Sequence, residues 1–184
     1  QSKALQLPLA HKAGFKVPDT LISNQKSKIL EFINKDDAPT IMKTFVQTRY
    51  FFDGDRPRPV YASKISEAEL RDEDEYLDQV SIFQKMVPKA YEIRALVLGS
   101  HVIAARIDAT SYDGKSVDSR RPAGDNAYGC YIDLPPDIVA KGISLMKALN
   151  IVTAAFDLLI TPDGDYVFLE LNEMGQSLYL EQYE

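Results

Sequence analysis

The chain has 184 residues, of which 45% are hydrophobic and 26% charged, and this composition excludes intrinsic disorder and suffices for one domain or two small lobes. The formal net charge of −6 does not favour nucleic-acid or anionic membrane partners, and no apolar run reaches the ~20 residues of a membrane span. One cysteine and two histidines exclude an internal disulfide framework and a zinc site, so any metal must take oxygen ligands. We expect a soluble cytoplasmic protein.

The first 80 residues alternate between short helical and strand-like segments. The pair Ser23-Asn24 is typical of a helix start, and apolar residues at helical spacing follow it. Asp53-Gly54 marks a turn between two strand-like runs. The expected elements are helices over 4–12, from the 23–24 cap to 34, and over 66–77, and strands over 20–22, 41–52 and 59–65. This order indicates a small α/β lobe.

Antiparallel strands dominate the pattern after residue 80. A strand over 81–87 ends at Pro88, and two hairpins are expected, with turns at Gly99-Ser100 and Asp163-Gly164. The expected elements are that strand, the hairpins 92–108 and 154–172, a long polar loop over 109–131, and a helix from 135–136 to 149. The sequence thus predicts an α+β protein with mainly antiparallel sheets, divided into a small lobe over 1–80 and a larger lobe over 81–184.

The second hairpin carries the strongest chemical signal. With a two-residue turn, Asp157 stands directly opposite Glu170, and strand alternation puts Asn172 on the same face. Two opposed carboxylates repel each other unless a positive charge lies between them, and magnesium accepts this oxygen set. Alternatively, Asp157 protonates, pairs with a base or lies at a solvated strand end. A three-residue bulged turn would instead separate the two acids.

Basic side chains stand on other predicted strands. Lys43 either reaches water with its ammonium group or holds that charge over a phosphate. Arg94 and Arg106 lie on the two arms of the first hairpin. A two-residue turn puts them on different faces, whereas a three-residue turn would make them a phosphate clamp. Salt bridges from Glu92 or Asp108 to an arginine are the simpler alternative.

The segment from Ile82 to Pro88 reads as an apolar strand that ends in an extended hinge, where main-chain groups could contact a planar base. Phosphate-binding loops of the Gly-x-x-x-x-Gly-Lys-Ser/Thr and Gly-x-Gly-x-x-Gly types are absent, as are the nucleophile elbow and the kinase catalytic loop. A nucleotide would therefore be bound by a protein outside those classes.

Taken together, the strand lysine, the hinge, the arginine hairpin and the acidic hairpin resemble the ATP-grasp superfamily in order and spacing. The resemblance implies the ATP-grasp fold, in which two α+β lobes clasp the nucleotide. It also implies that the family's N-terminal domain is absent before Gln1 and its closing helix absent after Glu184. The site residues implied are Lys43, Gln84, Lys85, Met86, Val87 and Glu92 for ATP, Asp157, Glu170 and Asn172 for magnesium, and Arg94, Arg106 and Arg120 near the reacting groups.

Three stretches, 10–24, 84–94 and 168–176, more narrowly resemble the graspetide synthetases, which are microviridin-type peptide maturases. This likeness implies an ATP- and magnesium-dependent ligase that phosphorylates Glu or Asp side chains of a precursor peptide with leader and core. It then closes macrocyclic esters or amides, and the family suggests a homodimer. Two alternatives are a ligase that adds amino acids to a small acid or protein terminus and an inactive nucleotide-binding module. Lys85 departs from the family because that hinge position is often acidic.

Overall fold

A computed structural model describes residues 3–44, 50–53, 56–59, 62–71, 74–107 and 129–173. The chain divides into two compact units, the first made of 1–18, 88–114 and 123–184, and the second of 19–87 and 115–122. The N-terminal segment, expected in the small lobe, thus groups with the C-terminal strands. The lobe assignment over 1–80 and 81–184 stays a prediction. Within the described ranges, no helix is long and apolar enough to cross a membrane.

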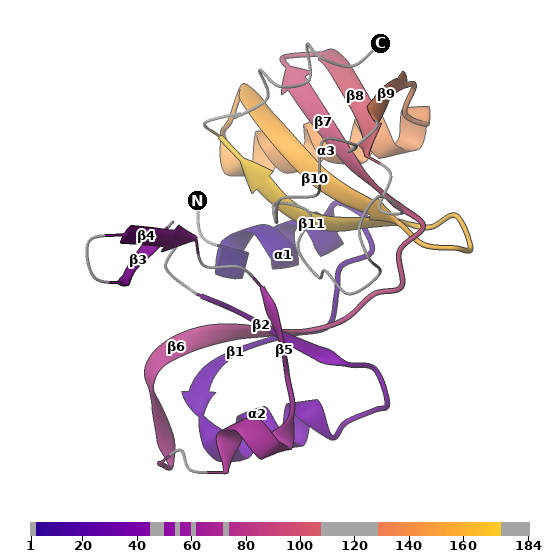
Figure 1. Cartoon of the computed structure of the whole chain (residues 1–184). Coiled ribbons are helices and arrows are strands. Elements are labelled where there is room, and N and C mark those ends of the chain that lie inside the picture. Colours follow the sequence, from indigo (N-terminus) through magenta and orange to yellow (C-terminus); the bar gives the residue numbers. More distant parts are fainter. Residues whose placement is uncertain are drawn as a thin grey trace. The chain divides into compact units, whose positions relative to one another are not determined.

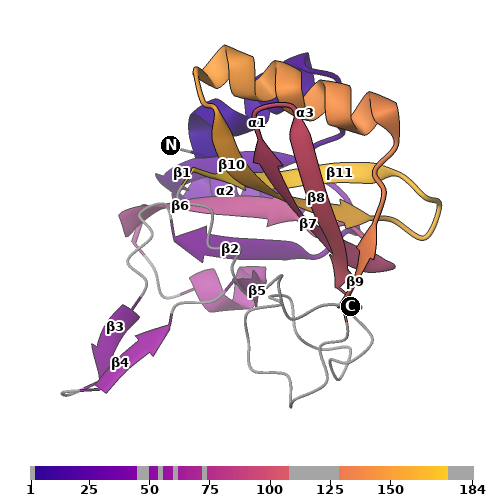
Figure 2. The same cartoon turned by 90° about the horizontal axis from the view of Figure 1, so that it is seen from above.

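The first unit is a five-stranded antiparallel sheet covered on one face by two helices (Figure 2). Its strand order is β11-β10-β7-β8-β9. The elements are α1 (Lys3–Lys12), β7 (Tyr91–Leu98), β8 (His101–Ile107), β9 (Gly129–Ile132), α3 (Pro136–Leu149), β10 (Thr153–Ile160) and β11 (Tyr166–Asn172). Alternate side chains of the strands pack against the helices and form the larger core, while the other half point to the opposite face.

Backbone geometry at the helix ends explains where these helices stop. Gly14, at φ 95°, follows α1, and the N–H groups of Gly14 and Phe15 donate to the carbonyls of His11 and Ala10. Asn150, at φ 55°, ends α3 in the same left-handed conformation. The helix from Pro136 to Leu149 is therefore confirmed.

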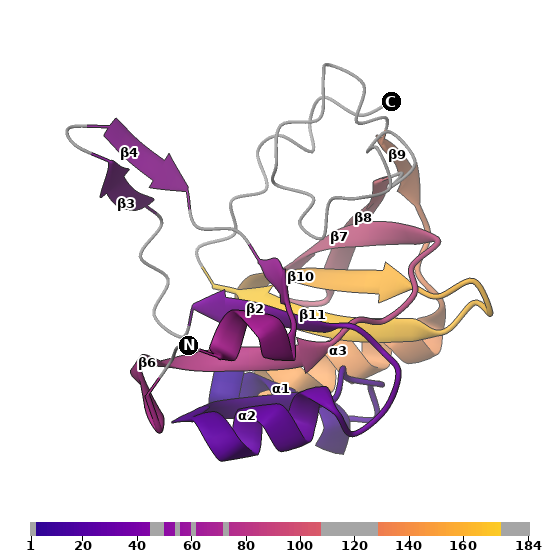
Figure 3. The same cartoon turned by 60° about the horizontal axis from the view of Figure 1, so that its bottom comes forward.

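The second unit contains a four-stranded antiparallel sheet in the order β1-β6-β2-β5, with helix α2 along one face (Figures 1 and 3). The elements are β1 (Thr20–Gln25), α2 (Lys26–Ile33), β2 (Thr40–Thr44), β5 (Ser63–Ile65), the 3-10 turn η1 (Glu67–Leu70) and β6 (Tyr76–Lys85). Strands β3 (Tyr50–Asp53) and β4 (Arg56–Pro59) form a separate hairpin. Ile29, Leu70 and Phe83 are the buried centre of the smaller core.

Several expected elements of this unit are wrong. The acidic helix over 66–77 is only the turn η1, closed by a capping box between Ser66 and Glu69, and Tyr76 already begins β6. The run of acids over 72–75 explains the failure, since like charges three or four residues apart destabilise a helix. Ser23 and Asn24 lie in β1 instead of capping α2, whose N-cap is Gln25. The expected return strand over 59–65 is divided between β4 and β5.

The first hairpin of the larger sheet has the two-residue turn, one of the two alternatives that the sequence left open. Leu98 pairs with His101 around Gly99-Ser100, and Gly99 has φ 63°. A positive φ at the first central residue is characteristic of the type II′ turn, whose twist suits the flanking strands. The polar loop expected over 109–131 ends earlier, because β9 begins at Gly129. Residues 108–128 lie outside the described part of the chain.

Candidate metal and nucleotide site

The acidic hairpin pairs Asp157 with Glu170, as predicted, but reaches this register by another route. Near the turn, Ile160 pairs with Tyr166, and the Gly164 N–H donates to the Thr161 carbonyl across a loop longer than two residues. A bulge at Leu169 then shifts the register by one.

The bulge also serves the core. Phe168 is 0% exposed in the helix-covered face, where it packs on Phe15 and Phe156. Strict alternation would put Phe168 on the same face as Glu170, and the extra residue at 169 places them on opposite faces. The hairpin can therefore bury an aromatic side chain and present a carboxylate two residues later.

Three side chains surround the acid pair. Asn172 Nδ2 lies 3.2 Å from Asp157 Oδ2 and 3.2 Å from Glu170 Oε1. Arg94 Nη1, from β7, lies 2.5 Å from Asp157 Oδ1, and Lys3 Nζ, from α1, lies 2.6 Å from Glu170 Oε2. The two carboxylates thus share one amide donor, and each also has its own cation.

The pKa values of the two carboxyl groups are shifted in opposite directions. Burial raises the pKa of Asp157 to about 7, against the lowering effect of Arg94 and with a further rise from the Glu170 charge. Burial alone would also raise the pKa of Glu170, but the Lys3 ammonium and hydrogen bonds from Lys3, Asn172 and Asp157 lower it to about 2. The pair therefore shares one proton near neutral pH, as closely placed carboxyl groups do.

This donor set fits a hard divalent cation. The Asn172 amide N–H group lies within hydrogen-bond distance of both carboxyl groups, and magnesium accepts carboxylate, amide and phosphate oxygens. The Asn172 amide presents its oxygen instead of its nitrogen after a half-turn, because the two orientations are distinguished only by the hydrogen bonds they make. The described residues contain no cluster of three or more His, Cys, Asp or Glu side chains. Asp157, Glu170 and Asn172 would therefore hold the ion together with oxygens of its ligand.

The arginines of the first hairpin lie on opposite faces of the sheet. Arg94 stands opposite Ala105 and Asp157 and is 7% exposed, so it belongs to the acid face. Arg106 pairs with Ile93, and its guanidinium lies 4.1 Å from the ring centroid of Tyr91 on the helix-covered face. The structure therefore contradicts a clamp formed by both arginines, and Arg106 is separated from the acid pair.

Two further predicted site residues have different outcomes. Glu92 lies on the acid-face side of β7 but pairs with Lys89 at 2.5 Å instead of with an arginine. Arg120 lies outside the described residues.

Lys43 and Gln84 meet on the second unit's sheet face opposite α2. Lys43 Nζ lies 2.7 Å from Gln84 Oε1, and Gln84 Nε2 donates to Thr20 Oγ1 at 3.0 Å. Their strand neighbours Met42 and Phe83 pack on the α2 side, so alternation places Lys43 and Gln84 on the other face. The ammonium group is thus fixed over the sheet by a neutral partner.

Lys85 points the other way. Its ammonium group lies 2.9 Å from the Ile33 carbonyl, 3.1 Å from the Ala38 carbonyl and 3.0 Å from Asp36 Oδ1. The Lys85 side chain, 6% exposed, therefore ties the C-terminal end of α2 to β6 and is not available to a base on the opposite face. This explains how a lysine is accommodated at a position where an acid is more usual.

The main chain of the expected hinge is partly occupied. The Lys85 N–H donates to the Asp19 carbonyl at 3.0 Å, and the Met86 N–H donates to the Pro39 carbonyl at 2.7 Å. The expectation that hinge N–H groups are free to contact a base is therefore wrong for these two. Within the described ranges, no hydrogen bond of Val87 is found, so its N–H is the hinge donor that the geometry leaves available.

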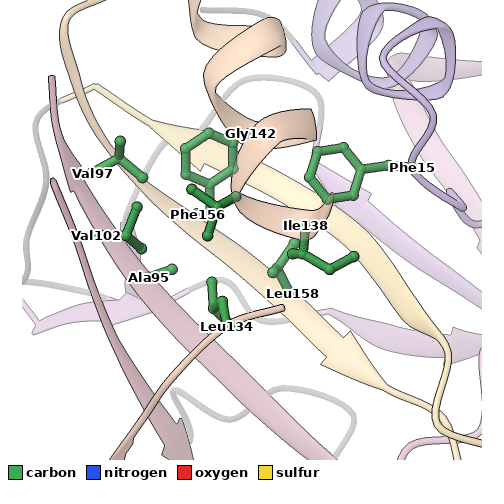
Figure 4. A pocket seen from close by; sticks show the side chains of 10 residues that line it. Phe15, Ala95, Val97, Val102, Leu134, Ile138, Gly142, Phe156 and Leu158 are labelled. Atoms are coloured by element: carbon green, nitrogen blue, oxygen red, sulfur yellow. The ribbon is translucent and has the colours of Figure 1, made fainter. Parts of the chain in front are cut away.

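Two hollows elsewhere in the described residues are poorer candidates for a nucleotide site than the acid face. A gap of about 10 Å³ lies under α3 in the larger core (Figure 4), which is barely one water in size and wholly apolar in its lining. A shallow groove of about 430 Å³ lies beside the α2–β2 connection, but its Asp36 is already paired with Lys85 and its Glu69 with Ser66. Neither combines the charges that a nucleotide would need.

Two residues of the site, both on α1, were not predicted from the sequence. Lys3 reaches Glu170, and the Gln6 side chain contacts the main chain of Leu171. Their spacing of three residues, one helical turn apart, was visible in the sequence. Nothing local indicated that this turn would meet a strand 165 residues away.

No family model matches the chain, and no curated protein matches it either. Solved structures do. A RiPP-associated ATP-grasp ligase from Chryseobacterium gregarium, in complex with ADP and a leader and core peptide, matches with a TM-score of 0.87 and 28% identity over 98% of this chain and 54% of its own. The macrocyclase MdnC from Microcystis aeruginosa, bound to precursor peptide MdnA, matches with a TM-score of 0.83 and 27% identity over 98% and 54%.

A third structure, the ATP-grasp ligase PsnB with a minimal precursor variant, Mg and ADP, is 20% identical with a TM-score of 0.76 over 98% of this chain and 52% of its own. The chain thus has the ATP-grasp fold, in the form found in RiPP ligases, which confirms the predicted fold class and resemblance. It spans about half the length of the solved relatives it matches.

Proposed function

We propose that this chain carries the magnesium- and nucleotide-binding part of an ATP-dependent ligase that cross-links a ribosomal precursor peptide into macrocyclic esters or amides. The observation that carries the proposal is the acid face of the first unit, where Asp157, Glu170 and Asn172 converge and Arg94 supplies a buried cation. The likeness to ligases solved with precursor peptides supports the choice of a peptide substrate.

In the proposed reaction, a Glu or Asp carboxylate of the peptide attacks the γ-phosphorus of ATP, giving an acyl phosphate and ADP. A hydroxyl or amine of the same peptide then attacks the acyl carbon, phosphate leaves, and the nucleophile loses its proton. Magnesium would supply charge neutralisation at the phosphates. This chain's residues would contribute binding and positioning, with Arg94 keeping Asp157 available as a ligand and Lys43 contacting phosphate.

Adenine recognition is assigned within this proposal to the segment from Gln84 to Val87, with the Val87 N–H as the main-chain donor. Arg120 is kept near the reacting groups on the resemblance alone. Arg106 is not retained in that role, because it lies on the helix-covered face. An enzyme of this kind is expected in the cytoplasm, where ATP is available, and as a homodimer, which sedimentation of the full-length protein would check.

The test is mass spectrometry of candidate precursor peptides incubated with the full-length protein and Mg-ATP, since each ring closed by dehydration removes one water. We expect Glu170→Gln and Lys43→Met each to abolish that loss while the far-UV circular dichroism stays unchanged. Asp165→Asn is the matched control, because Asp165 lies on the same hairpin and pairs with exposed Lys16. Unchanged ring formation by Glu170→Gln would contradict the proposal.

ADP release in the same incubations separates the alternatives. ADP release that requires a long peptide supports the maturase, whereas release with free amino acids supports a ligase for small acids or protein termini. Nucleotide binding without any ADP release would identify an inactive module.

A further inference from the structure

Helix α1 closes the outer edge of β11 with a side chain. Gln6, 2% exposed, accepts a hydrogen bond from the Leu171 N–H at Oε1, 3.0 Å away, and donates from Nε2 to the Leu171 carbonyl at 2.8 Å. One amide side chain therefore makes both main-chain contacts that a neighbouring strand would make at this residue.

Leu171 is the residue where such a contact has most effect. β11 is an edge strand of its sheet, so the groups that point away from β10 have no ladder partner. Leu171 lies between Glu170 and Asn172, and its own side chain is anchored in the core at 2% exposure. Holding the Leu171 main chain therefore fixes the direction in which both neighbouring side chains leave the strand.

Nearby contacts show that this fixation is local. Three residues earlier, the Phe168 N–H donates to the Lys16 carbonyl at 2.9 Å, so the far side of the Leu169 bulge has a separate anchor. Between these two anchors lie only Leu169, the bulge residue, and Glu170. One turn before Gln6, Lys3 reaches Glu170 itself.

We propose that Gln6 is a positioning residue of the divalent-cation site: its side-chain amide pins the main chain at Leu171 so that Glu170 and Asn172 stay directed at one point. Its functional consequence depends on the proposed magnesium role of the acid face. Gln6 touches neither the ion nor the nucleotide, and it acts through the backbone of the ligand strand, as supporting residues of metal sites do.

The experiment compares Gln6→Met with the wild-type full-length protein by two measurements. The first is residue-resolved hydrogen exchange without metal, and the second is calorimetric titration of ADP at a series of magnesium concentrations. Leu7→Ala is the matched control, because Leu7 is the next residue of α1, is 6% exposed and packs in the core with an apolar side chain, which cannot hydrogen-bond the Leu171 main chain. Gln6→Glu is a second variant that keeps the acceptor for the Leu171 N–H but loses the donor to its carbonyl.

In Gln6→Met, we expect exchange at the Leu171 amide to become about tenfold faster relative to Phe168, since one lost hydrogen bond of ordinary strength has that effect. The magnesium concentration that supports half-maximal ADP binding should rise on the order of tenfold. Gln6→Glu should also raise the magnesium requirement, but it should accelerate exchange at the Leu171 amide less than Gln6→Met does, because it keeps the acceptor for that N–H. Leu7→Ala should accelerate exchange broadly and leave the magnesium requirement unchanged.

An unchanged magnesium requirement in both Gln6 variants, with a wild-type protein that needs magnesium, would overturn the inference and leave the proposed function standing. A wild-type protein that binds ADP equally with and without magnesium would instead overturn the proposed function and the inference with it. Equal responses of Leu7→Ala and Gln6→Met would show that α1 only stabilises the fold, which also overturns the inference.

Discussion

Exchanging Arg94 for methionine removes the buried cation of the acid face and keeps an unbranched apolar chain in its place. Arg94 is 7% exposed and its guanidinium lies 2.5 Å from Asp157. Removing one partner of a buried ion pair costs about 3–5 kcal/mol, because the other charge stays buried without compensation. Since Asp157 can take up a proton with a pKa of about 7, we expect a loss of about 3 kcal/mol at pH 8 and a smaller loss at pH 5.

Arg106→Met is the matched control on the adjacent strand. Its guanidinium stacks on Tyr91 at the helix-covered face, a contact worth about 1 kcal/mol at a half-buried site. Urea unfolding of both variants at pH 5 and pH 8 gives the free energies of unfolding. Equal losses of stability in the two variants, or a loss in Arg94→Met that does not depend on pH, would contradict the role assigned to the Arg94–Asp157 pair.

Two further predictions concern stability. Without divalent cations, the free energy of unfolding should fall as pH rises from about 4 to about 7, because the pKa of Asp157 is higher in the folded state than its ordinary 3.8. Chemical denaturation at a series of pH values measures this profile, and Asp157→Asn should flatten that part of it. Gly142→Ala should stabilise the protein by about 1 kcal/mol, seen as a raised Tm, because alanine favours the helix interior more than glycine does. The added methyl group would meet the Phe156 ring at an ordinary contact distance of 3.6 Å (Figure 4). A lowered Tm would show that the gap beside Gly142 has no room for the methyl group.

The sequence predicted the acidic hairpin because its determinants are local. Alternating apolar residues, a Gly-containing turn and two acids at mirrored positions predict Asp157 opposite Glu170, and this pairing is confirmed although the two-residue turn assumed for it is not. It could not predict that the loop would be longer and that a bulge at Leu169 would correct the register. That bulge is set by Phe168, whose burial against Phe15, in the segment after α1, and Phe156 of β10 depends on tertiary packing.

The remaining differences also come from contacts distant in sequence. Strand alternation, together with the β2–β6 register, puts Lys43 and Lys85 on opposite faces of the sheet. Only the position of α2 decides which of the two faces is covered. Lys85 is consequently a structural residue although it lies within a motif-like segment. The prediction of a helix over 66–77 is wrong because the capping box at Ser66 supports a single turn, and the acidic residues after that turn do not favour further helix.

The extra residue at position 169 makes the two ends of the β10–β11 hairpin independent of each other. On the loop side Ile160 pairs with Tyr166, and on the acid side Asp157 pairs with Glu170, which is one residue further along β11 than the loop-side register would give. A change in loop length that altered the register near the turn would not be passed on to Glu170. Lys16 and Gln6 hold the main chain of β11 by hydrogen bonds on either side of the bulge. The Thr161–Asp165 loop is therefore a place where this scaffold can accept inserted sequence, such as an epitope tag, while its acidic end keeps its shape.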